Sequence, residues 1–293
     1  MNIQWFPGHM TKARRQMQED IRLIDLVIEL LDARIPLSSR NPEIDKLSRG
    51  KERMILLNKA DLADPDETGR WLNRFEAEGI TALALDSRET SSRKVIQKAM
   101  MEATAAKRER DMKRGLKNRP IRAMIAGIPN VGKSTLINSL AGKAATRTGN
   151  KPGVTKGKQW IHLRDHVDLL DTPGILWPKF EGQEVGIHLA MIGAVADHVL
   201  QVEELSLSVI SFLRSFYPGR LRDRYAISEE GEDVGILEAI ALKRGCLVAG
   251  NEIDYLKAAN LVLDEFRKGQ LGRVSVERVA ESSGDDTSSI EFL

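Results

Sequence analysis

The N-terminal part of the chain alternates short apolar runs with longer amphipathic segments. Met10, Ala13, Met17, Ile21 and Ile24 recur at helical spacing with charged residues between them, which predicts an amphipathic helix. Runs of β-strand length follow at residues 26–31, 54–57, 80–85, 123–126, 160–163 and 167–170. Most of these runs are separated by helix-length segments, and this alternation predicts an α/β fold with a mostly parallel sheet and helices on both faces. Only residues 164–166 separate the last two runs, which favours an antiparallel hairpin there.

From about residue 190 onward the pattern is helical. Leu205, Val209, Leu213 and Phe216 fall on one helical face, and two further helical patterns cover residues 234–244 and 252–268 without an intervening strand. We therefore expect an α/β domain over residues 1–190 and a smaller, all-helical domain over residues 191–275. Residues 281–293 are rich in Ser, Asp and Glu, and we expect residues 276–293 to form a flexible tail.

Composition narrows the class of protein. A chain of 293 residues is long enough for two domains, and 42% hydrophobic with 29% charged residues is typical of a soluble globular protein. The single cysteine excludes an internal disulfide and a cysteine-based metal cage. The apolar runs are too short to span a membrane, and the N-terminus lacks the layout of a signal peptide. These features predict a cytoplasmic protein with no membrane span.

The net charge of +2 conceals an uneven distribution of charge. Residues 107–160 contain fourteen Lys and Arg but only two acids, Glu109 and Asp111. Such a basic stretch favours a polyanionic partner, although a solvated helix end followed by a linker would give the same composition. Composition alone leaves both interpretations open.

Residues 127–134, Gly-Ile-Pro-Asn-Val-Gly-Lys-Ser, match the phosphate-loop pattern between an apolar strand and a helix-like segment. In such a loop the backbone amides and the helix N-terminus face phosphate oxygens, Lys133 neutralises the β and γ phosphates, and the Ser134 hydroxyl binds Mg²⁺. The alternative is a glycine-rich turn that enters a helix, but the strand-turn-helix setting favours the phosphate loop. The predicted nucleotide-binding residues of this segment are Asn130, Val131, Gly132, Lys133, Ser134 and Thr135.

A second candidate segment follows the apolar run at 167–170. Asp171 ends this run where a phosphate-loop enzyme places a carboxylate for Mg²⁺, and Gly174 offers a backbone N–H to the γ-phosphate. The string Asp-Thr-Pro-Gly is also compatible with a simple turn, but its position downstream of the phosphate loop favours the nucleotide role. Thr155 lies in a loop rich in Gly and Lys, where its hydroxyl is predicted to reach Mg²⁺; a turn or strand-start threonine is the alternative.

A third segment indicates which base is recognised. Asn58, Lys59, Ala60 and Asp61 follow the apolar run at 54–57. The Asp61 carboxylate can accept hydrogen bonds from guanine N1–H and the N2 amino group together, which adenine cannot provide, so guanine is favoured and an ATP-using enzyme is disfavoured. Helix N-capping by Asn58 or Asp61 is the alternative. The next segment, Asp86-Ser87-Arg88, could offer backbone contacts to the base, and its Asp86 and Ser87 are predicted to bind the nucleotide.

Together these segments indicate a GTPase whose motifs occur in an unusual order, with the base-recognition segments before the phosphate loop. In this order, and in the strings at residues 5–10, 32–36, 152–155 and 171–178, the chain resembles the circularly permuted GTPases of the YlqF/YawG family. The resemblance implies a permuted P-loop GTPase fold, hydrolysis of GTP to GDP and phosphate, and Mg²⁺ as cofactor. It also implies a role in late maturation of the large ribosomal subunit, with rRNA and ribosomal proteins as partners and no DNA. A GTP-gated RNA-binding chaperone in which hydrolysis is incidental remains the alternative.

The resemblance further implies roles for individual residues. The position after Gly174 is Ile175, whose apolar side chain cannot orient the attacking water, so His9, expected on an exposed loop, is assigned this role. A structural hydrogen bond or a contact with RNA phosphate is the alternative for His9. The implied catalytic set is completed by Lys133, Thr155 and Gly174, and Asn130 is expected to bind K⁺.

In the helical domain, a basic group is expected to bind rRNA phosphates. Its members are Arg220, Arg222, Arg224, Lys243 and Arg244. Complementation of a helix dipole explains Lys243 and Arg244 equally well, because both end a predicted helix.

Overall fold

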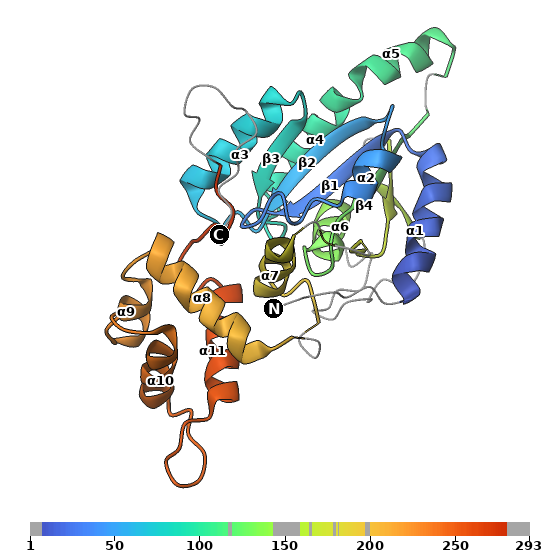
Figure 1. Cartoon of the computed structure of the whole chain (residues 1–293). Helices are drawn as coiled ribbons and strands as arrows, with labels where there is room; N and C mark the ends of the chain where they lie inside the picture. Colours follow the sequence, from blue (N-terminus) through green and yellow to red (C-terminus); the bar gives the residue numbers. More distant parts are fainter. Residues whose placement is uncertain are drawn as a thin grey trace.

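The computed structural model describes residues 8–116, 119–142, 159–163, 166–177, 180, 182–196 and 200–279, apart from the side chain of His9. Its central feature is a six-stranded sheet in the order β3-β2-β1-β4-β6-β5 (Figure 1). The strands are β1 (Leu26–Asp32), β2 (Glu52–Asn58), β3 (Thr81–Leu85), β4 (Ile121–Ala126), β5 (Gln159–Leu163) and β6 (Val167–Asp171). All neighbouring pairs are parallel except β5 and β6, which form the predicted antiparallel hairpin. The six predicted strands and the α/β class are confirmed.

Helices connect the strands and cover the sheet. They are α1 (Gly8–Asp20), the short 3₁₀ helix η1 (Ile21–Leu23), α2 (Pro42–Leu47), α3 (Pro65–Ala77), α4 (Ser92–Ala103), α5 (Ala105–Lys113), α6 (Lys133–Ala141) and α7 (Gln183–Met191). The predicted N-terminal helix is confirmed as α1, and its periodic residues Met10, Ala13 and Met17 are buried. In Figure 1, α5 projects beyond the sheet.

The core lies on both faces of the sheet, because successive side chains of a strand point in opposite directions. Leu30 of β1 belongs to a large cluster that includes α1, α4 and α6, whereas Leu31 packs with Trp71 and Phe75 of α3 on the other face. Every residue of β1 is buried. Central parallel strands covered on both faces are expected to be apolar throughout, as β1 largely is.

The chain beyond residue 200 forms a group of helices that lies apart from the sheet in Figure 1. These helices are α8 (Val202–Phe216), α9 (Arg220–Tyr225), α10 (Asp233–Arg244) and α11 (Tyr255–Arg267). Leu205, Val209 and Leu213 are buried on the inner face of α8, which confirms the predicted helical pattern. The sequence did not predict α9, because six residues are too few to establish a hydrophobic period.

The predicted boundary of the tail at residue 276 does not coincide with the end of packing. The Val276 amide donates to Arg34 O at 2.8 Å, and Trp71 Nε1 donates to Glu277 O at 3.2 Å. Residues 276–279 therefore return to the sheet-containing part, although they fall within the predicted tail. Residues 280–293 lie outside the described residues. Within the described chain, no helix combines the length and hydrophobicity that a membrane span requires.

Candidate nucleotide-binding site

The predicted motifs meet at one edge of the sheet. Strands β2, β3, β4 and β6 are parallel, so the segments that follow them all emerge at the carboxyl edge. The chain continues from β1 outward to β2 and β3, then crosses to β4 on the other side of β1. Ligands of open α/β sheets bind at such a reversal of strand order, outside the carboxyl ends of the strands.

The phosphate loop is shaped by backbone positions that only certain residues tolerate. A Cβ at Gly127 would lie 2.5 Å from Leu30 O of the neighbouring strand, so the loop can leave β4 closely only without a side chain. Asn130 and Gly132 adopt positive φ angles of 59° and 101°, which turn the loop into the first turn of α6. The loop amides and the N-terminus of α6 thereby form an anion-binding concavity.

The Lys133 side chain folds back over this loop. Its Nζ donates to Gly127 O at 2.9 Å and to Ile128 O at 2.7 Å. Burial lowers the pKa of Lys133 to about 8, and the nearby Asp171 carboxylate opposes this shift. The ammonium group is thus held beside the loop in a position where phosphate oxygens would favour its charged form.

The segment after β6 packs directly against the phosphate loop. Thr172 Oγ1 donates to Ile125 O of β4 at 2.6 Å. A Cβ at Gly174 would lie 2.8 Å from Lys133 Nζ and 2.9 Å from Pro129 Cα, so this glycine leaves open the space beside the ammonium group. The next side chain, Ile175, is 3% exposed, which fits the prediction that it does not orient water.

The donor atoms of the site fit Mg²⁺, which prefers oxygen ligands and retains several from phosphate or water. Ser134 lies in the first turn of α6, and Asp171, which ends β6, pairs with Ile125 of the neighbouring strand β4. The described residues contain no group of three or more His, Cys, Asp or Glu that could hold a metal ion by themselves. The third predicted ligand, Thr155, lies outside the described residues.

Asn58 links the base-recognition segments to the phosphate loop. Its Nδ2 donates to Val131 O at 2.7 Å, and its Oδ1 accepts from the Ser87 amide at 2.9 Å. The alternative role of Asn58 or Asp61 as a helix cap is wrong, because Asp64 accepts from the first amides of α3 instead. Two segments separated by about seventy residues of chain thus form one surface.

Lys59 is held by a buried pair that the sequence did not predict as part of the site. Lys59 Nζ lies 3.0 Å from Asp32 Oδ2, and Arg34 Nη2 contacts the same oxygen at 2.9 Å. Burial alone would raise the pKa of Asp32, but Arg34 and Lys59 hold this pKa well below its usual range. The charges of the pair keep the strained Lys59, with φ of 59°, in place next to Asp61. No local motif connects Asp32 to Lys59, because the contact depends on the pairing of β1 with β2.

Asp61 and Asp86 both contact Arg88, a residue of the predicted segment 86–88 whose ion pairs the sequence did not predict. Arg88 Nη2 contacts Asp61 Oδ2 at 2.6 Å and Asp86 Oδ2 at 2.7 Å. Hydrogen bonds from Arg88 hold the pKa of Asp86 below its usual range. Asp61 Oδ1 is buried without a hydrogen-bond partner in the described structure, as suits an acceptor for a ligand N–H. The sequence placed Arg88 in this segment for its backbone, and the structure shows that its side chain joins the two carboxylates.

The phosphate loop also contacts the segment after α7. Asn130 Nδ2 donates to Gly193 O at 2.8 Å, which fixes the orientation of the amide expected to bind K⁺. Arg267 at the end of α11 reaches the last turn of α7, directly before this segment, donating to Met191 O at 3.1 Å and to Ala190 O at 2.8 Å. A short series of contacts therefore connects the phosphate loop with the helical region.

His9 lies in the first turn of α1. The expectation that His9 lies on a loop is wrong, because α1 begins at Gly8; the apolar period of this segment extends the helix to its first turn. The side chain of His9 lies outside the described structure.

Among the predicted RNA-binding residues, two arginines are engaged internally. Arg224 Nε lies 2.7 Å from Glu265 Oε2, while Arg244 lies 3.7 Å from the same carboxylate and stacks over Tyr225. Arg222 Nε lies 3.3 Å from Asp223 Oδ1, and all five residues of the group are exposed.

The described fold and site define a class: a P-loop GTPase with circularly permuted motif order. A family described as 50S ribosome-binding GTPase matches residues 122–223. Ribosome biogenesis GTPase A of Priestia megaterium is 49% identical over 284 residues, which cover 96% of this chain and 99% of the relative. Mitochondrial ribosome-associated GTPase 1 of Ictalurus punctatus is 34% identical, with 93% and 92% of the two chains covered. The crystal structure of GNP-bound YlqF from T. maritima superposes with a TM-score of 0.66 at 32% identity, covering 91% of this chain and 98% of that one.

The chain belongs to the family of the ribosome biogenesis GTPase A proteins, also named YlqF. It is accordingly a guanine-nucleotide-binding enzyme that hydrolyses GTP, and its permuted phosphate-loop fold is the one the sequence predicted.

Proposed function

We propose that this GTPase times a late step in maturation of the large ribosomal subunit. In its GTP state it binds rRNA and ribosomal proteins of the precursor, and hydrolysis of GTP releases it. The names of its relatives support a role in ribosome assembly. A cytoplasmic location and the absence of a DNA partner accompany this proposal.

The observation that carries the proposal is the contact between the phosphate loop and the segment held by the helical region. Asn130 of the loop is hydrogen-bonded to Gly193, and Arg267 of α11 binds the carbonyl groups just before it. A change in the phosphate loop on loss of the γ-phosphate would shift Asn130. The segment at Gly193, whose neighbouring carbonyl groups are hydrogen-bonded to Arg267, would then move with it. Loops ordered by γ-phosphate and Mg²⁺ are known two-state elements.

The residues of the site divide the chemical work between them. Mg²⁺ bound by Ser134, Asp171 and Thr155 would neutralise charge on the phosphates. Lys133 holds the phosphate oxygens, and the Gly174 amide binds the γ-phosphate. Because Ile175 is buried, we assign water positioning to His9 at the start of α1.

Asn130 is the proposed ligand of K⁺. Its Nδ2 is engaged by Gly193, so its Oδ1 is the atom available for a cation. The K⁺ charge would supply what an arginine finger supplies in other GTPases.

Contact with rRNA in the helical region is assigned to Arg220, Arg222, Arg224, Lys243 and Arg244. Arg220 and Lys243 are the most available, because within the described residues neither pairs with a carboxylate, whereas Arg224 and Arg244 share Glu265 and Arg222 pairs with Asp223. To bind RNA, Arg224 and Arg244 would have to release the Glu265 carboxylate and contact a phosphate group instead.

Nucleotide substitution tests the timing role. Purified large-subunit precursors are incubated with the protein and either GTP or a non-hydrolysable analogue, and release of the protein and completion of the particle are measured. The proposal predicts release and completion with GTP, and a stalled complex with the analogue. Complete maturation with either nucleotide would instead support the chaperone in which hydrolysis is incidental. In the same assay, His9→Ala should retain GTP binding and lose stimulated turnover; an unchanged stimulated kcat would remove His9 from the mechanism.

A further inference from the structure

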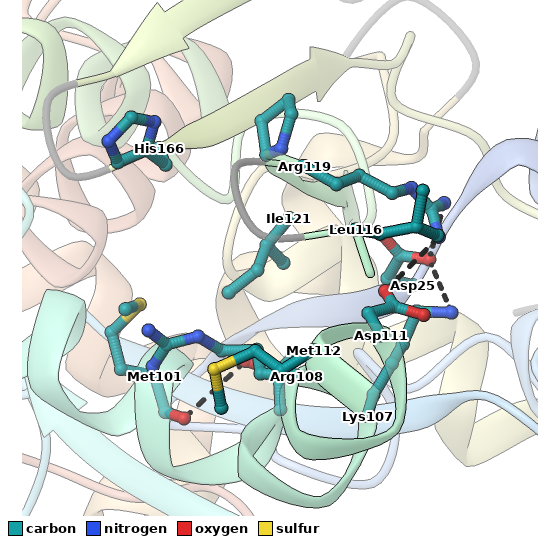
Figure 2. Close-up of a pocket in the computed structure, with 12 residues that line it drawn as sticks. Asp25, Met101, Lys107, Arg108, Asp111, Met112, Leu116, Arg119, Ile121 and His166 are labelled. Atoms are coloured by element: carbon teal, nitrogen blue, oxygen red, sulfur yellow. Dashed lines mark hydrogen bonds and ion pairs between the residues drawn. The ribbon is translucent and has the colours of Figure 1, made fainter. Parts of the chain in front are cut away.

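The edge of the sheet opposite the nucleotide carries a basic surface of its own. A cavity of about 110 Å³ opens between α5 and the residues that precede β1, β4 and β6, among them Asp25, Pro120 and His166 (Figure 2). A second depression of about 190 Å³ shares Asp25 and Lys107 with the first. Asp25, Pro120 and His166 lie directly before β1, β4 and β6, so this surface belongs to the amino edge of the sheet. A seven-residue strand separates the amino edge from the carboxyl edge by roughly 20 Å.

Part of the charge at this surface is neutralised by ion pairs. Figure 2 shows Lys107 and Arg119 converging on Asp25, at 3.0 Å and 3.2 Å, and Arg119 also lies 3.3 Å from Asp111. These pairs hold α5 against the start of β1. These ion pairs orient α5 relative to the sheet.

Three cations around α5 have no such partners. Arg108, Lys113 and Arg114 are exposed, and within the described residues none of them forms an ion pair with a carboxylate. Arg108 lines the first depression and Arg114 lines the second, so these two cations and Lys113 are distributed around α5 beside the two depressions. Neighbouring guanidinium and ammonium groups without counterions raise the local concentration of a polyanion.

The exposure of its side chains distinguishes α5 from the helices that cover the sheet. None of its nine residues is buried. A helix this short is marginal in water unless it packs against something, and α5 contributes no side chain to the core. Its apolar residues are Ala105, Ala106 and Met112, which do not form a continuous apolar stripe suited to insertion into a membrane surface.

We propose that α5, through the unpaired cations Arg108, Lys113 and Arg114 around it, binds the phosphate backbone of a structured RNA. This inference rests on the proposed function, which supplies rRNA as the partner, and extends it by a second RNA-binding surface. Guanidinium groups bind phosphate oxygens in a bidentate manner, and the depressions beside α5 leave room for the backbone to approach them. The protein would then contact RNA at the amino edge while the carboxyl edge holds the nucleotide.

The test replaces the three unpaired cations in the full-length protein by Arg108→Gln, Lys113→Gln and Arg114→Gln. Binding to purified large-subunit rRNA and to large subunits is measured over a range of salt concentrations. We expect affinity for rRNA to fall roughly tenfold or more, and the slope of log affinity against log salt concentration to decrease by about 2, since each lost phosphate contact contributes about 0.7–0.9. GTP binding and basal hydrolysis should be unchanged, because these residues lie at the opposite edge from the nucleotide site.

A matched control removes the same charge elsewhere by Lys46→Gln, Lys94→Gln and Lys98→Gln, which are exposed positions on α2 and α4. The control should leave both the affinity and the salt slope close to those of the original protein. Equal losses in the two triple variants, or no loss in the α5 variant, would overturn the α5 surface while leaving the proposed function intact. A loss of binding to anionic vesicles or polyglutamate, with rRNA binding retained, would assign α5 to another partner and also overturn it. If the unmodified protein bound neither rRNA nor large subunits, the proposed function would fall together with this inference.

Discussion

At the scale of single residues, the phosphate site depends on the charge of one buried lysine. Lys133 is 7% exposed and hydrogen-bonded to two loop carbonyls, so its ammonium group has lost most of its contact with water. Loss of solvation lowers the pKa of Lys133 to about 8 in the protein without nucleotide. Bound phosphate groups favour the charged form and raise this pKa again. Nucleotide binding is therefore linked to proton uptake once the pH exceeds about 8.

The sign of the pH dependence follows from this linkage. Below pH 8, Lys133 is already protonated in the free protein, and nucleotide affinity is at its full value. Above that pH a proton must be taken up on binding, so affinity falls by up to about tenfold per pH unit. Equilibrium binding of GTP between pH 7 and pH 9 measures the fall, and calorimetry in buffers of different ionisation enthalpy measures the proton.

The variant Lys133→Arg separates this effect from titration of the nucleotide. A guanidinium group stays charged throughout the range, so only the pH dependence of the ligand should remain. Identical pH profiles for the two proteins would show that Lys133 does not titrate in this range.

At the scale of elements, the site depends on how closely two loops approach. The segment after β6 lies on the phosphate loop, and Gly174 is the position where a side chain would intrude between Lys133 and Pro129. The sequence placed the two segments after the strands that became β4 and β6, because each motif is local. It could not predict their separation, which is set by the register of β4 and β6.

Gly174→Ala tests this close approach. The added methyl group must displace either the Lys133 ammonium or the Pro129 backbone, and overpacking of this kind costs about 1–3 kcal/mol. We expect GTP affinity to fall by roughly 10- to 100-fold. The effect on GDP should be smaller, because GDP has no γ-phosphate to meet Gly174.

Gly235→Ala in α10 is the matched control, since a Cβ there meets no atom within 4 Å. It should leave nucleotide affinity unchanged. A Gly174→Ala protein with normal discrimination between GTP and GDP would contradict the assigned role of this glycine.

At the scale of the whole molecule, the C-terminal segment joins the helical region to the sheet. The Glu277 carboxylate is 2% exposed and accepts from the amides of Leu37 at 2.6 Å and Ser38 at 2.9 Å. It also contacts the Ser38 hydroxyl and His188 Nδ1 of α7, so three distant parts of the chain meet on one side chain. The sequence did not predict that Glu277 is buried, because a charged residue at the start of a predicted tail is expected to be exposed.

Removal of the Glu277 carboxylate should therefore loosen the assembly of the two parts. Glu277→Ala leaves several buried donors without an acceptor, and we expect the free energy of unfolding to fall by about 3 kcal/mol. Urea unfolding measures the change, and limited proteolysis reports whether the segment has detached. Glu76→Ala, an exposed position on α3, should change stability by no more than about 0.5 kcal/mol. Equal effects of the two substitutions would show that Glu277 does not hold the C-terminal segment.

The sequence by itself determined the strands, most helices, the nucleotide motifs and their permuted order, because periodicity and motif spacing are local properties of the chain. Tertiary structure alone decided which side chains support those motifs: Asn58 bridging to Val131, Asp32 holding Lys59, Arg88 over Asp61, and Asn130 on Gly193. Each of these contacts joins positions on different elements, and each is fixed by strand order and packing. It also decided that Arg224 and Arg244 share a carboxylate while three cations around α5 stay unpaired, since pairing depends on which elements lie together.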